Sequence, residues 1–452
     1  CASIGKRYGR NGCPHCQLLP TAEPSNTILS MKEQKRVPKL RFAEFSGEWE
    51  VNKLRDISKI YDGTHQTPKY VEKGVPFYSV EHLTSNQFES TKYISEEVFN
   101  KENKRVKLEK GDILMTRIGS IGVSKYIDWD VCASFYVSLA LIKKKKEYES
   151  PFLNQFIKSD FFQRELWKKT IHVAFPQKIN LGEIGECPVA LPSPKEQQKI
   201  ASFLSSVDKK ITQLQQKKSL LEDYKKGVMQ QIFSQELRFT REDGNAYPEW
   251  EEKKFKEIYS FYSTNSFSRD KLNYESGEVR NVHYGDIHTK FSTLFDIKDE
   301  LVPYINSEID LSKIKKDSYL KLGDILIADA SEDYNDIGKT IEIVNLNNEK
   351  VISGLHTFHA RPNKHKMALG FSGYLLQSWI VRKQVMKIAQ GTKVLGISTG
   401  RLGEIKFFTP SYPEQTQIAN FLSTIDKKIA VVETQIEQTQ QFKKGLLQQM
   451  FV

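Results

Sequence analysis

Two stretches of the chain place apolar residues at spacings built from threes and fours. The first stretch has Ile200, Leu204, Val207, Ile211, Leu214, Leu221, Val228 and Ile232, and the second has Ile418, Leu422, Ile425, Ile429, Val432, Ile436, Leu446 and Met450. Such a stripe is typical of a helix that packs along a partner helix. The alternative is two unrelated core helices, each packed on its own domain. We predict pairing of the two helices through Leu204, Val207, Ile211 and Leu214 on one and Leu422, Ile425, Ile429 and Val432 on the other.

The sequence also indicates where these helices begin. Pro194 and Pro413 stand where a helix can start, and Glu196 and Glu414 supply the acidic first turn that a helix favours. A single helix over residues 195–233 would be about 60 Å long at about 1.5 Å per residue.

The two stretches belong to an internal duplication. Residues 192–197, 200–205 and 207–211 return as residues 410–415, 418–423 and 425–429, and the offset of 218 holds without a gap for some forty residues. Weaker echoes lie upstream, where Leu40-Arg41-Phe42, Glu48-Trp49-Glu50 and Gly111-Asp112-Ile113-Leu114 resemble Leu237-Arg238-Phe239, Glu249-Trp250-Glu251 and Gly323-Asp324-Ile325-Leu326. The chain is therefore predicted to be a variable domain, a shared segment, a second variable domain and the shared segment again.

The variable domains have mixed α/β patterns. Residues 113–115 and 137–142 are predicted strands, and residues 152–169 are a predicted helix. The second copy repeats this pattern around residues 323–327 and 371–387. We place the domains at residues 31–192 and 236–410, with the helices in residues 193–235 and 411–452.

Residues 1–30 are rich in Gly, Pro, Ser and Asn, and a plausible native start is Met31. We expect them to be an expression leader or translated upstream sequence. Cys13-Pro14-His15-Cys16 could be a redox pair or half of a zinc site, but no second pair of ligands accompanies it. Five cysteines in total fit a reducing, cytoplasmic location.

Composition narrows the class of protein. The net charge of +11 favours a polyanionic partner such as nucleic acid, although a basic protein without such a partner would have the same charge. A hydrophobic content of 39% and a mean hydropathy of -0.51 fit a water-soluble protein with sizeable cores. No apolar run is long enough to span a membrane, and no secretory signal is present.

Motifs for enzyme chemistry are incomplete. Ile337-Gly338-Lys339-Thr340 ends like a phosphate-binding loop, but Asp333 stands where that loop needs glycine. No Pro-Pro dipeptide exists to form the base-binding motif of an adenine methyltransferase, and Glu251-Glu252-Lys253 lacks the aspartate partner of a nuclease centre. His356 and His359 would point to opposite faces of a strand, so no metal site is predicted.

The duplicated pattern resembles the specificity subunit of type I restriction-modification systems. The resemblance is carried by Val37-Pro38-Lys39-Leu40-Arg41-Phe42, by Gly111-Asp112-Ile113-Leu114 before Arg117-Ile118-Gly119-Ser120, and above all by the two segments from Pro-Ser to Asp-Lys-Lys-Ile. It covers residues 31–452. The second copy departs from it with Ala328-Asp329-Ala330-Ser331 in the loop.

The resemblance implies an α+β fold with two mixed α/β target-recognition domains joined by two long antiparallel coiled-coil helices, related by a pseudo-two-fold repeat. Each domain would read one half of a bipartite, asymmetric sequence in double-stranded DNA. Two modification subunits would dock on the chain and bring S-adenosylmethionine, so this chain would bind no cofactor and catalyse nothing. Restriction and translocase subunits would join them.

Side chains that can reach DNA bases and phosphates stand in the predicted loops. The candidates are Thr116, Arg117, Ser120, Lys125, Gln177 and Lys178 in the first domain, and Ser331, Asn335, Lys339 and Lys393 in the second. Each could equally be a solvated surface residue, and Arg117 could instead form a structural salt bridge. Two rival functions remain, a coiled-coil scaffold without DNA specificity and a self-sufficient DNA-modifying enzyme.

Overall fold

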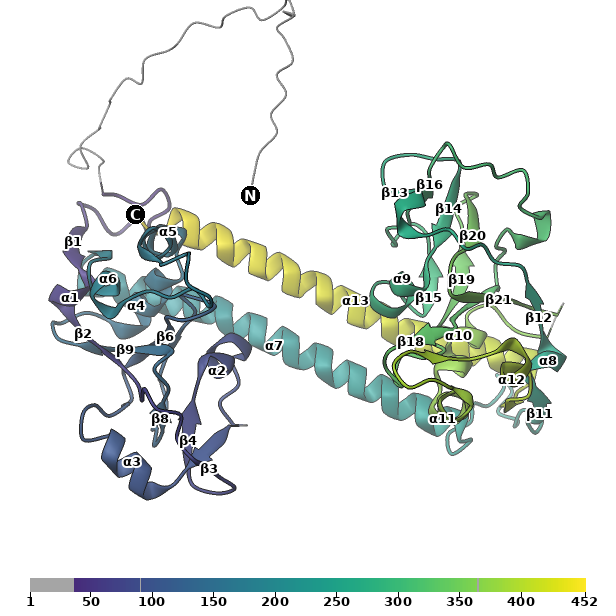
Figure 1. Cartoon of the computed structure of the whole chain (residues 1–452), viewed down its shortest axis with the longest axis horizontal. Coiled ribbons are helices and arrows are strands. Elements are labelled where there is room, and N and C mark those ends of the chain that lie inside the picture. The colour runs from purple at the N-terminus through teal and green to yellow at the C-terminus, as the bar shows by residue number, and fades with distance from the viewer. Residues whose placement is uncertain (1–35, 90, 364–365) are drawn as a thin grey trace, which may run out of the picture. The chain divides into compact units, whose positions relative to one another are not determined.

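The computed structural model describes residues 36–89, 91–363 and 366–452, so the 1–30 segment and the Cys13–Cys16 pair lie outside it. The chain divides into two compact units. Unit 1 contains the described residues up to Ser202 together with residues 445–452, and unit 2 contains residues 203–444. Each unit holds one mixed α/β domain (Figure 1), which confirms the predicted fold class.

Among the described residues, two four-stranded sheets and a two-stranded sheet of β1 and β10 form the domain of unit 1. The first has the antiparallel order β2-β9-β6-β7 and the second the order β3-β5-β4-β8, in which β4 and β8 are parallel. The strands are β1 (Glu50–Lys53), β2 (Ser58–Asp62), β3 (Tyr70–Val71), β4 (Val75–Tyr78), β5 (Lys92–Ile94), β6 (Ile113–Thr116), β7 (Ser124–Tyr126), β8 (Ser134–Phe135), β9 (Leu139–Lys144) and β10 (Pro188–Leu191). The helices are α1 (Leu54–Ile57), α2 (Val80–Ser85), α3 (Glu96–Glu102), α4 (Ser150–Ile157), α5 (Asp160–Lys169) and α6 (Leu181–Gly185).

The domain of unit 2 repeats this plan with a larger first sheet. Its larger sheets have the orders β12-β21-β17-β19-β15 and β13-β16-β14-β20, and β11 with β23 and β18 with β22 form two-stranded sheets. The strands are β11 (Glu251–Lys254), β12 (Tyr259–Tyr262), β13 (Leu272–Asn273), β14 (Val279–Val282), β15 (Leu294–Asp296), β16 (Tyr304–Ile305), β17 (Ile325–Ala328), β18 (Ala330–Ser331), β19 (Thr340–Asn345), β20 (Lys350–Ser353), β21 (Thr357–Pro362), β22 (Leu395–Gly396) and β23 (Lys406–Thr409). The helices are α8 (Phe255–Ile258), α9 (Tyr284–Thr289), α10 (Phe371–Gln377), α11 (Trp379–Ile388) and α12 (Thr399–Gly403), with short 3-10 turns at Arg269–Lys271 and Lys316–Ser318.

One prediction for each domain is wrong in detail. Residues 152–169 and 371–387 were each expected to form one helix, but the structure has two helices in each place, α4 with α5 and α10 with α11. The breaks lie at Ser159 and Ser378, whose backbones are extended (ψ 151° and 148°) and start the second helix as N-caps. Serine is favoured where a helix begins because its side-chain oxygen can accept from the amides of the first turn, as Ser159 does from the amide of Phe162. The apolar period alone does not reveal this.

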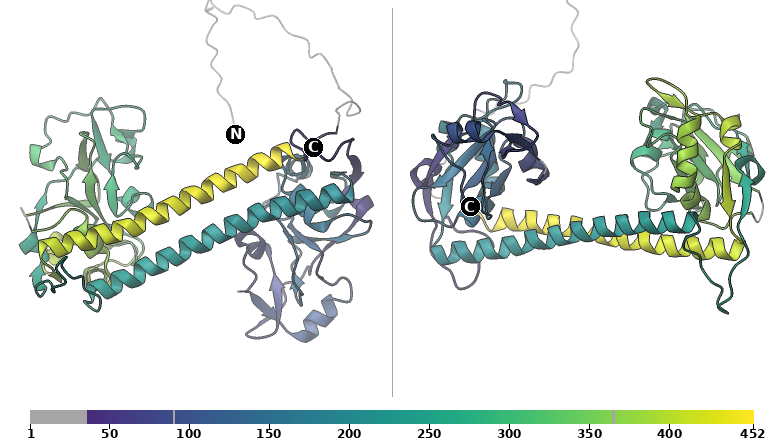
Figure 2. Two further views of the ribbon diagram at one scale, coloured as in Figure 1. Left: turned by 180° about the vertical axis from the view of Figure 1, so that it is seen from behind. Right: turned by 90° about the horizontal axis from the view of Figure 1, so that it is seen from below.

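The two long helices are α7 (Pro194–Phe233) and α13 (Tyr412–Gln449). They begin close to where Pro194 and Pro413 predict. Within unit 2 they run side by side in the views of Figures 1 and 2. Ion pairs between described residues join them, among them Asp208–Lys443 at 2.6 Å, Lys218–Glu433 at 2.9 Å and Lys225–Asp426 at 2.5 Å. The residue numbers in each pair add to 651, as a single antiparallel register requires.

This register and the repeat offset of 218 together locate an approximate two-fold axis. Asp208–Lys443 and Lys225–Asp426 are copies of one ion pair under the offset. In this register, the point of α7 that lies opposite its own repeat copy falls between residues 216 and 217. The corresponding point of α13 falls between residues 434 and 435. The local axis of the helix pair therefore passes through that point.

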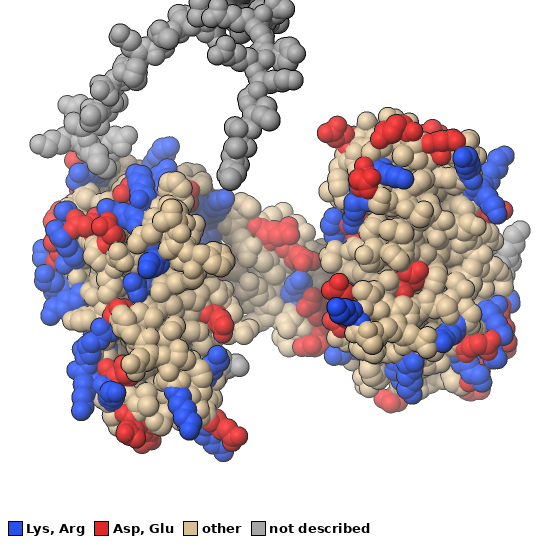
Figure 3. All heavy atoms as spheres, viewed as in Figure 1, with Lys and Arg blue, Asp and Glu red and all other residues tan. Residues whose placement is uncertain are grey.

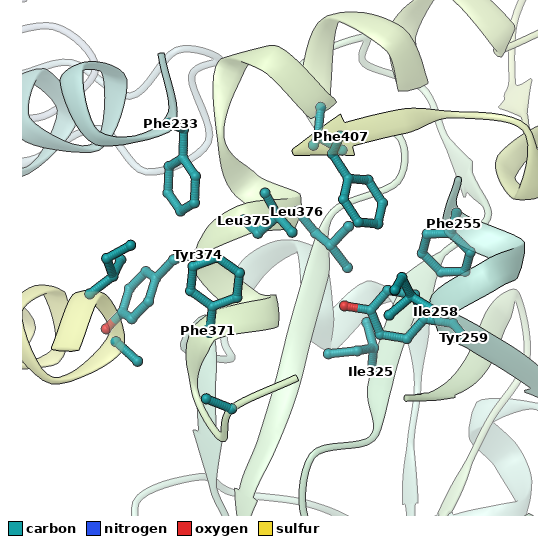
Figure 4. Packing of buried hydrophobic residues seen from close by; sticks show 14 of the residues in the cluster. Phe233, Phe255, Ile258, Tyr259, Ile325, Phe371, Tyr374, Leu375, Leu376 and Phe407 are labelled. Carbon is teal, nitrogen blue, oxygen red and sulfur yellow. The ribbon is translucent and has the colours of Figure 1, made fainter. Parts of the chain in front are cut away.

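The predicted pairing stripe faces inward. Leu204, Val207, Leu214, Leu422, Ile425 and Val432 are buried, and Ile211 and Ile429 are half-buried. Val228 and Ile232 of α7 share one apolar cluster with Ile418, Leu422 and Ile425 of α13. The same cluster contains Phe255, Tyr259, Phe371, Tyr374 and Phe407 from the domain of unit 2 (Figure 4). In unit 2 the helices are thus part of the domain core.

Repeated motifs anchor the start of each long helix. In unit 1, Arg41 holds the buried Glu196 through two contacts of 2.8 Å, and in unit 2 Arg238 holds the buried Glu414 through contacts of 3.2 and 3.3 Å. The arginine of each Leu-Arg-Phe motif therefore pairs with the glutamate of the Glu-Gln motif in the same unit. A buried carboxylate needs this partner because an unpaired charge is costly to bury.

The residue after each of these glutamates has an equally constant role. Gln197 donates to the carbonyl of Pro192 and accepts from the amide of Glu149, while Gln415 donates to Pro410 and accepts from Ala368. The glutamine thereby ties the end of a strand to the segment that leads into α4 or α10.

The echoed tryptophans hold the ends of the long helices. Trp49 packs edge-on against Phe451, which follows α13, with ring centroids 6.3 Å apart. Trp250 packs against Phe233, the last residue of α7, with ring centroids 6.4 Å apart. Phe233 and Phe451 are related by the same offset of 218. Each unit thus fixes the beginning of one long helix and the end of the other.

We predict that Arg41→Ala lowers the free energy of unfolding by about 3–5 kcal/mol, because it leaves the carboxylate of Glu196 buried without a partner. Lys110→Ala, which removes an exposed ion pair with Asp130 at 3.7 Å, is the control and should cost about 0–1 kcal/mol. Urea denaturation of both variants measures the difference. Equal losses would show that Arg41–Glu196 does not anchor the helix.

Candidate nucleic-acid interface

In unit 1 the chain leaves the buried strand β6 through residues 117–123, here called the glycine loop. Gly119 and Gly122 have φ of +79° and +88°, which residues with a side chain rarely adopt. A Cβ on Gly122 would also lie 2.5 Å from the side chain of Gln163 on α5. The amide of Gly122 donates to Thr116 at 2.9 Å and closes the loop. These glycines are thus needed for the shape of the loop and its close packing on α5.

The glycine loop pairs with a hairpin formed by residues 171–178. Ile171 bridges to Lys178, Ile118 also bridges to Lys178, and the amide of Gly119 donates to the carbonyl of Gln177 at 2.8 Å. The structure therefore brings together candidates that are sixty residues apart. Ser120, Gln177 and Lys178 are all exposed on this surface, and Lys178 makes no ion pair with any other described residue.

Arg117 and Thr116 are turned toward the protein. The guanidinium of Arg117 donates to the carbonyl of Val137 at 2.8 Å and to that of Ile179 at 3.2 Å, and partial burial lowers its pKa. Thr116 is fully buried, and its hydroxyl donates to the carbonyl of Ser120 within the loop. In this structure both residues hold the glycine loop against its neighbours.

Lys125 lies apart from the paired loops. Its Nζ donates to the side chain of Asn86 at 2.9 Å and stands over the rings of Phe88 and Trp129, each at 5.6 Å. This lysine therefore stabilises an aromatic group beside α2.

Unit 2 builds the same arrangement from different residues. After β17 the chain enters residues 329–338, here called the acidic loop, and β18 at its start pairs with β22 in a hairpin of residues 390–396. Ala330 faces Gly396 and Ser331 faces Leu395. The loop after the central strand thus meets the hairpin after the second domain helix in both units.

The four candidates of unit 2 differ in exposure and in the hydrogen bonds that they form within the protein. Ser331 is buried and accepts from the amide of Asp333 at 3.0 Å, and the carbonyl of Asn335 accepts from Arg382 at 2.9 Å. Lys339 donates to the carbonyl of His288 at 2.5 Å. Asn335 presents an exposed side chain, and Lys393 is exposed on the hairpin. The last two are placed to meet a ligand.

The two loops differ in charge. The acidic loop carries the exposed Glu332 and Asp333, whereas the glycine loop and its hairpin carry Arg117 and Lys178. The pKa of Asp329 at the start of the acidic loop is raised, because the effect of burial outweighs the opposing effect of His356, whose Nδ1 lies 3.2 Å from the carboxylate. Carboxylates repel phosphates but can accept from the amino group of cytosine. The two units therefore offer different chemistry at equivalent positions.

Sequence reasoning missed the apolar tips of the hairpins. Val173 and Phe175 are fully exposed, and Val394 is more than half exposed. Each stands between a domain helix and the polar residues of its hairpin, outside any helical or strand period. Apolar residues in a polar, non-periodic stretch were the available signal. Such tips can wedge between bases or pack on sugars.

On the face seen in Figure 3, charge by itself does not mark a binding surface. Basic and acidic side chains are interspersed on the face seen in Figure 3, with a broad uncharged area in each unit. Among the described residues, no helix is long and apolar enough to cross a membrane. The described part of the chain also contains no group of three His, Cys, Asp or Glu residues placed to hold a metal ion.

Comparisons with known proteins agree with this duplicated plan. The type I restriction enzyme MjaVIII specificity subunit of Methanocaldococcus jannaschii is 26% identical over 416 residues, which cover 88% of this chain and 91% of the relative. The crystal structure of a type I restriction-modification S subunit from M. genitalium covers 92% of this chain and 99% of its own, with a TM-score of 0.55 and 15% identity.

A further solved chain, from work on complex assembly and conformational transition of the type I R-M system, has a TM-score of 0.51 at 13% identity and covers 88% of this chain and 96% of its own. The family model for the type I restriction modification DNA specificity domain matches residues 46–223 and again residues 247–441. These two matches cover most of the chain and follow its internal repeat. The chain therefore belongs to the family of type I restriction-modification DNA specificity subunits.

Proposed function

We propose that this chain reads the two halves of a bipartite, asymmetric DNA target, one half with each unit, and docks the subunits that modify and cut the DNA. The observation that carries the proposal is the double match to the DNA specificity domain, once in each half of the chain. In each unit the paired loops would face the DNA. The recognition domains would be residues 31–192 and 236–410.

The different chemistry of the loops supports an asymmetric target. Gln177 and Lys178 in unit 1 suit adenine and guanine edges, whereas Glu332 and Asp333 in unit 2 suit cytosine. A palindromic target would need equivalent readers in both units. The exposed Asn335 and Lys393 would add contacts to the second half-site.

Repeat-related surfaces on the helices support the docking of two modification subunits. Tyr224 on α7 and Phe442 on α13 are separated by the offset of 218, and each side chain is more than half exposed. Equivalent exposed aromatic residues on a pseudo-symmetric pair can receive two copies of one partner. Restriction and translocase subunits would assemble on that core.

We place methyl transfer on the partner subunits, which would bind S-adenosylmethionine. The chain would then need no cofactor and act in the cytoplasm beside the DNA. This distinguishes it from a self-sufficient modifying enzyme, and its DNA binding distinguishes it from a coiled-coil scaffold.

The isolated chain is predicted to bind duplex DNA and leave it unmodified. A gel shift against a random-sequence duplex library, followed by sequencing of the bound fraction, should enrich a two-part motif. Incubation with radiolabelled S-adenosylmethionine should transfer no label unless modification subunits are added. Label transfer by the pure chain would identify an enzyme, and failure to shift any duplex would favour a scaffold.

The helix pair is predicted to set the gap between the half-sites. Seven residues inserted after Leu214 and seven inserted after its repeat copy Val432 add about 10.5 Å at 1.5 Å per residue, or about three base pairs. Both insertions are needed because the ends of both helices are fixed. The bases read in each half should not change. A changed half-site with an unchanged gap would contradict this role; insertion in α7 alone is the control and should destabilise the pair.

Arg117 and Lys178 are predicted to act differently. Arg117→Ala should reduce the stability of unit 1 by about 1.5–3 kcal/mol, because two carbonyls lose a charged donor. Lys178→Ala should leave the melting temperature unchanged and weaken DNA binding. Thermal melts and affinities for a panel of single-base variants measure both effects. If Arg117→Ala keeps its stability but loses preference at one base, Arg117 is a base reader instead.

A further inference from the structure

A cavity of about 780 Å³ lies in unit 2, within the size range of small-molecule sites. It opens at the N-terminus of the ten-residue helix α11, and its walls come from α7, α10, α11 and α13. Lys339, at the end of the acidic loop, also lines it. The candidate loop residues are therefore adjacent to the cavity, but the cavity is a separate feature.

Two buried side chains that line this cavity each have a polar atom without a hydrogen-bond partner among the described residues. Ser378 is 3% exposed and its Oγ makes no hydrogen bond, and Arg382 is 6% exposed and its Nη1 makes none. The other end of the guanidinium is used, since Nη2 donates to the carbonyl of Asn335 at 2.9 Å. Burial lowers the pKa of Arg382, and the charge of the nearby Asp336, which forms no ion pair with it, opposes this shift. A buried charge left in this condition is costly unless a counter-ion joins it.

The start of α11 adds to the positive potential. Ser378 is the N-cap residue but forms no capping hydrogen bond, and the first turn contains no acidic residue. The free amides and the helix dipole at such an end attract anions. Lys339 and Lys226 line the same cavity and add two cations. Of the two acids in the lining, Asp426 is already paired with Lys225 at 2.5 Å and Glu222 with Lys218 at 3.6 Å.

At the equivalent place in unit 1, the polar side chains form hydrogen bonds within the protein. There Ser159 caps α5, accepting from the amide of Phe162 and donating to Phe156, and Asp160 supplies an acid in the first turn. Gln163 stands where unit 2 has Arg382, and it donates to Gly122 at 3.0 Å and Ile157 at 2.7 Å. Unit 2 therefore replaces an acid by Trp379 and a neutral amide by an arginine. Both changes make the local charge more positive, which favours an external anion.

We propose that this cavity binds the phosphate group of a nucleotide, held by Arg382, Ser378 and the first turn of α11. The adjoining walls suit a base, because Trp379 is 59% exposed and Met229 and Ile429 present apolar surface. The phosphate has two sources, a free mononucleotide or the backbone of DNA. Unlike the proposed function, this inference does not require the paired loops to read sequence.

The test uses the full chain and a matched pair of variants. Arg382→Gln installs the residue that unit 1 has at this position, and Lys383→Gln removes the same charge from the exposed neighbour on α11. Isothermal titration calorimetry with inorganic phosphate, and then with adenosine 5′-monophosphate, measures the free source. Gel shifts with a 20-base-pair duplex of several sequences measure the DNA source.

Saturable binding of adenosine 5′-monophosphate that weakens about tenfold or more in Arg382→Gln, and less than about twofold in Lys383→Gln, supports the free source. A fall in duplex affinity that is confined to Arg382→Gln and equal for all sequences supports the DNA source. If neither ligand responds, or if both variants lose equally, the proposal is overturned. If Arg382→Gln does not fold, Trp379→Asp replaces it, since it puts an acid at the exposed first position of α11 and should repel the same phosphate.

Discussion

The antiparallel register of α7 and α13 is the constraint on which the rest of the protein depends. The ion pairs between the helices fit one register. Because repeat copies occupy equivalent places in that register, the helix pair has an approximate two-fold axis. A slip of one heptad would separate Asp208 from Lys443 and Lys225 from Asp426 together. The apolar stripe drives the association, and the charged pairs select one alignment among several.

The register matters because both ends of each helix are fixed. Arg41 and Arg238 hold the buried glutamates at the helix starts, and Trp49 and Trp250 pack on the phenylalanines at the helix ends. These four positions recur in the two halves of the chain, whereas the loops that follow β6 and β17 do not. The duplication thus repeats the frame and leaves the paired loops free to diverge. This difference between frame and loops fits the proposed function, in which the frame would dock the same partner subunits while the loops would read different bases.

Much of this fold could be predicted from the sequence. A gapless repeat and a heptad stripe can be recognised in a single sequence. The long helices and the order of the two domains could therefore be predicted. The breaks at Ser159 and Ser378 could not be predicted, because a serine that begins a new helix inside an apolar period has no distinct spacing. The site was harder still. Pairing of the glycine loop with residues 171–178 depends on tertiary contacts. The inward turn of Arg117 depends on the carbonyls of Val137 and Ile179, which are 20 and 62 residues away in the sequence. The sequence places Lys125 with the candidates of the glycine loop, but its Nζ lies over the rings of Phe88 and Trp129.

The most direct test of the account is methylation-aware sequencing of DNA from cells that contain this chain with its modification subunits, compared with cells that lack only this chain. The account predicts one methylated motif that disappears with the chain. That motif should have two specified, non-palindromic halves separated by an unspecified gap of fixed length. A methylated motif that persists without the chain, or a continuous or palindromic one that depends on it, would contradict the claim that the two units read two different half-sites.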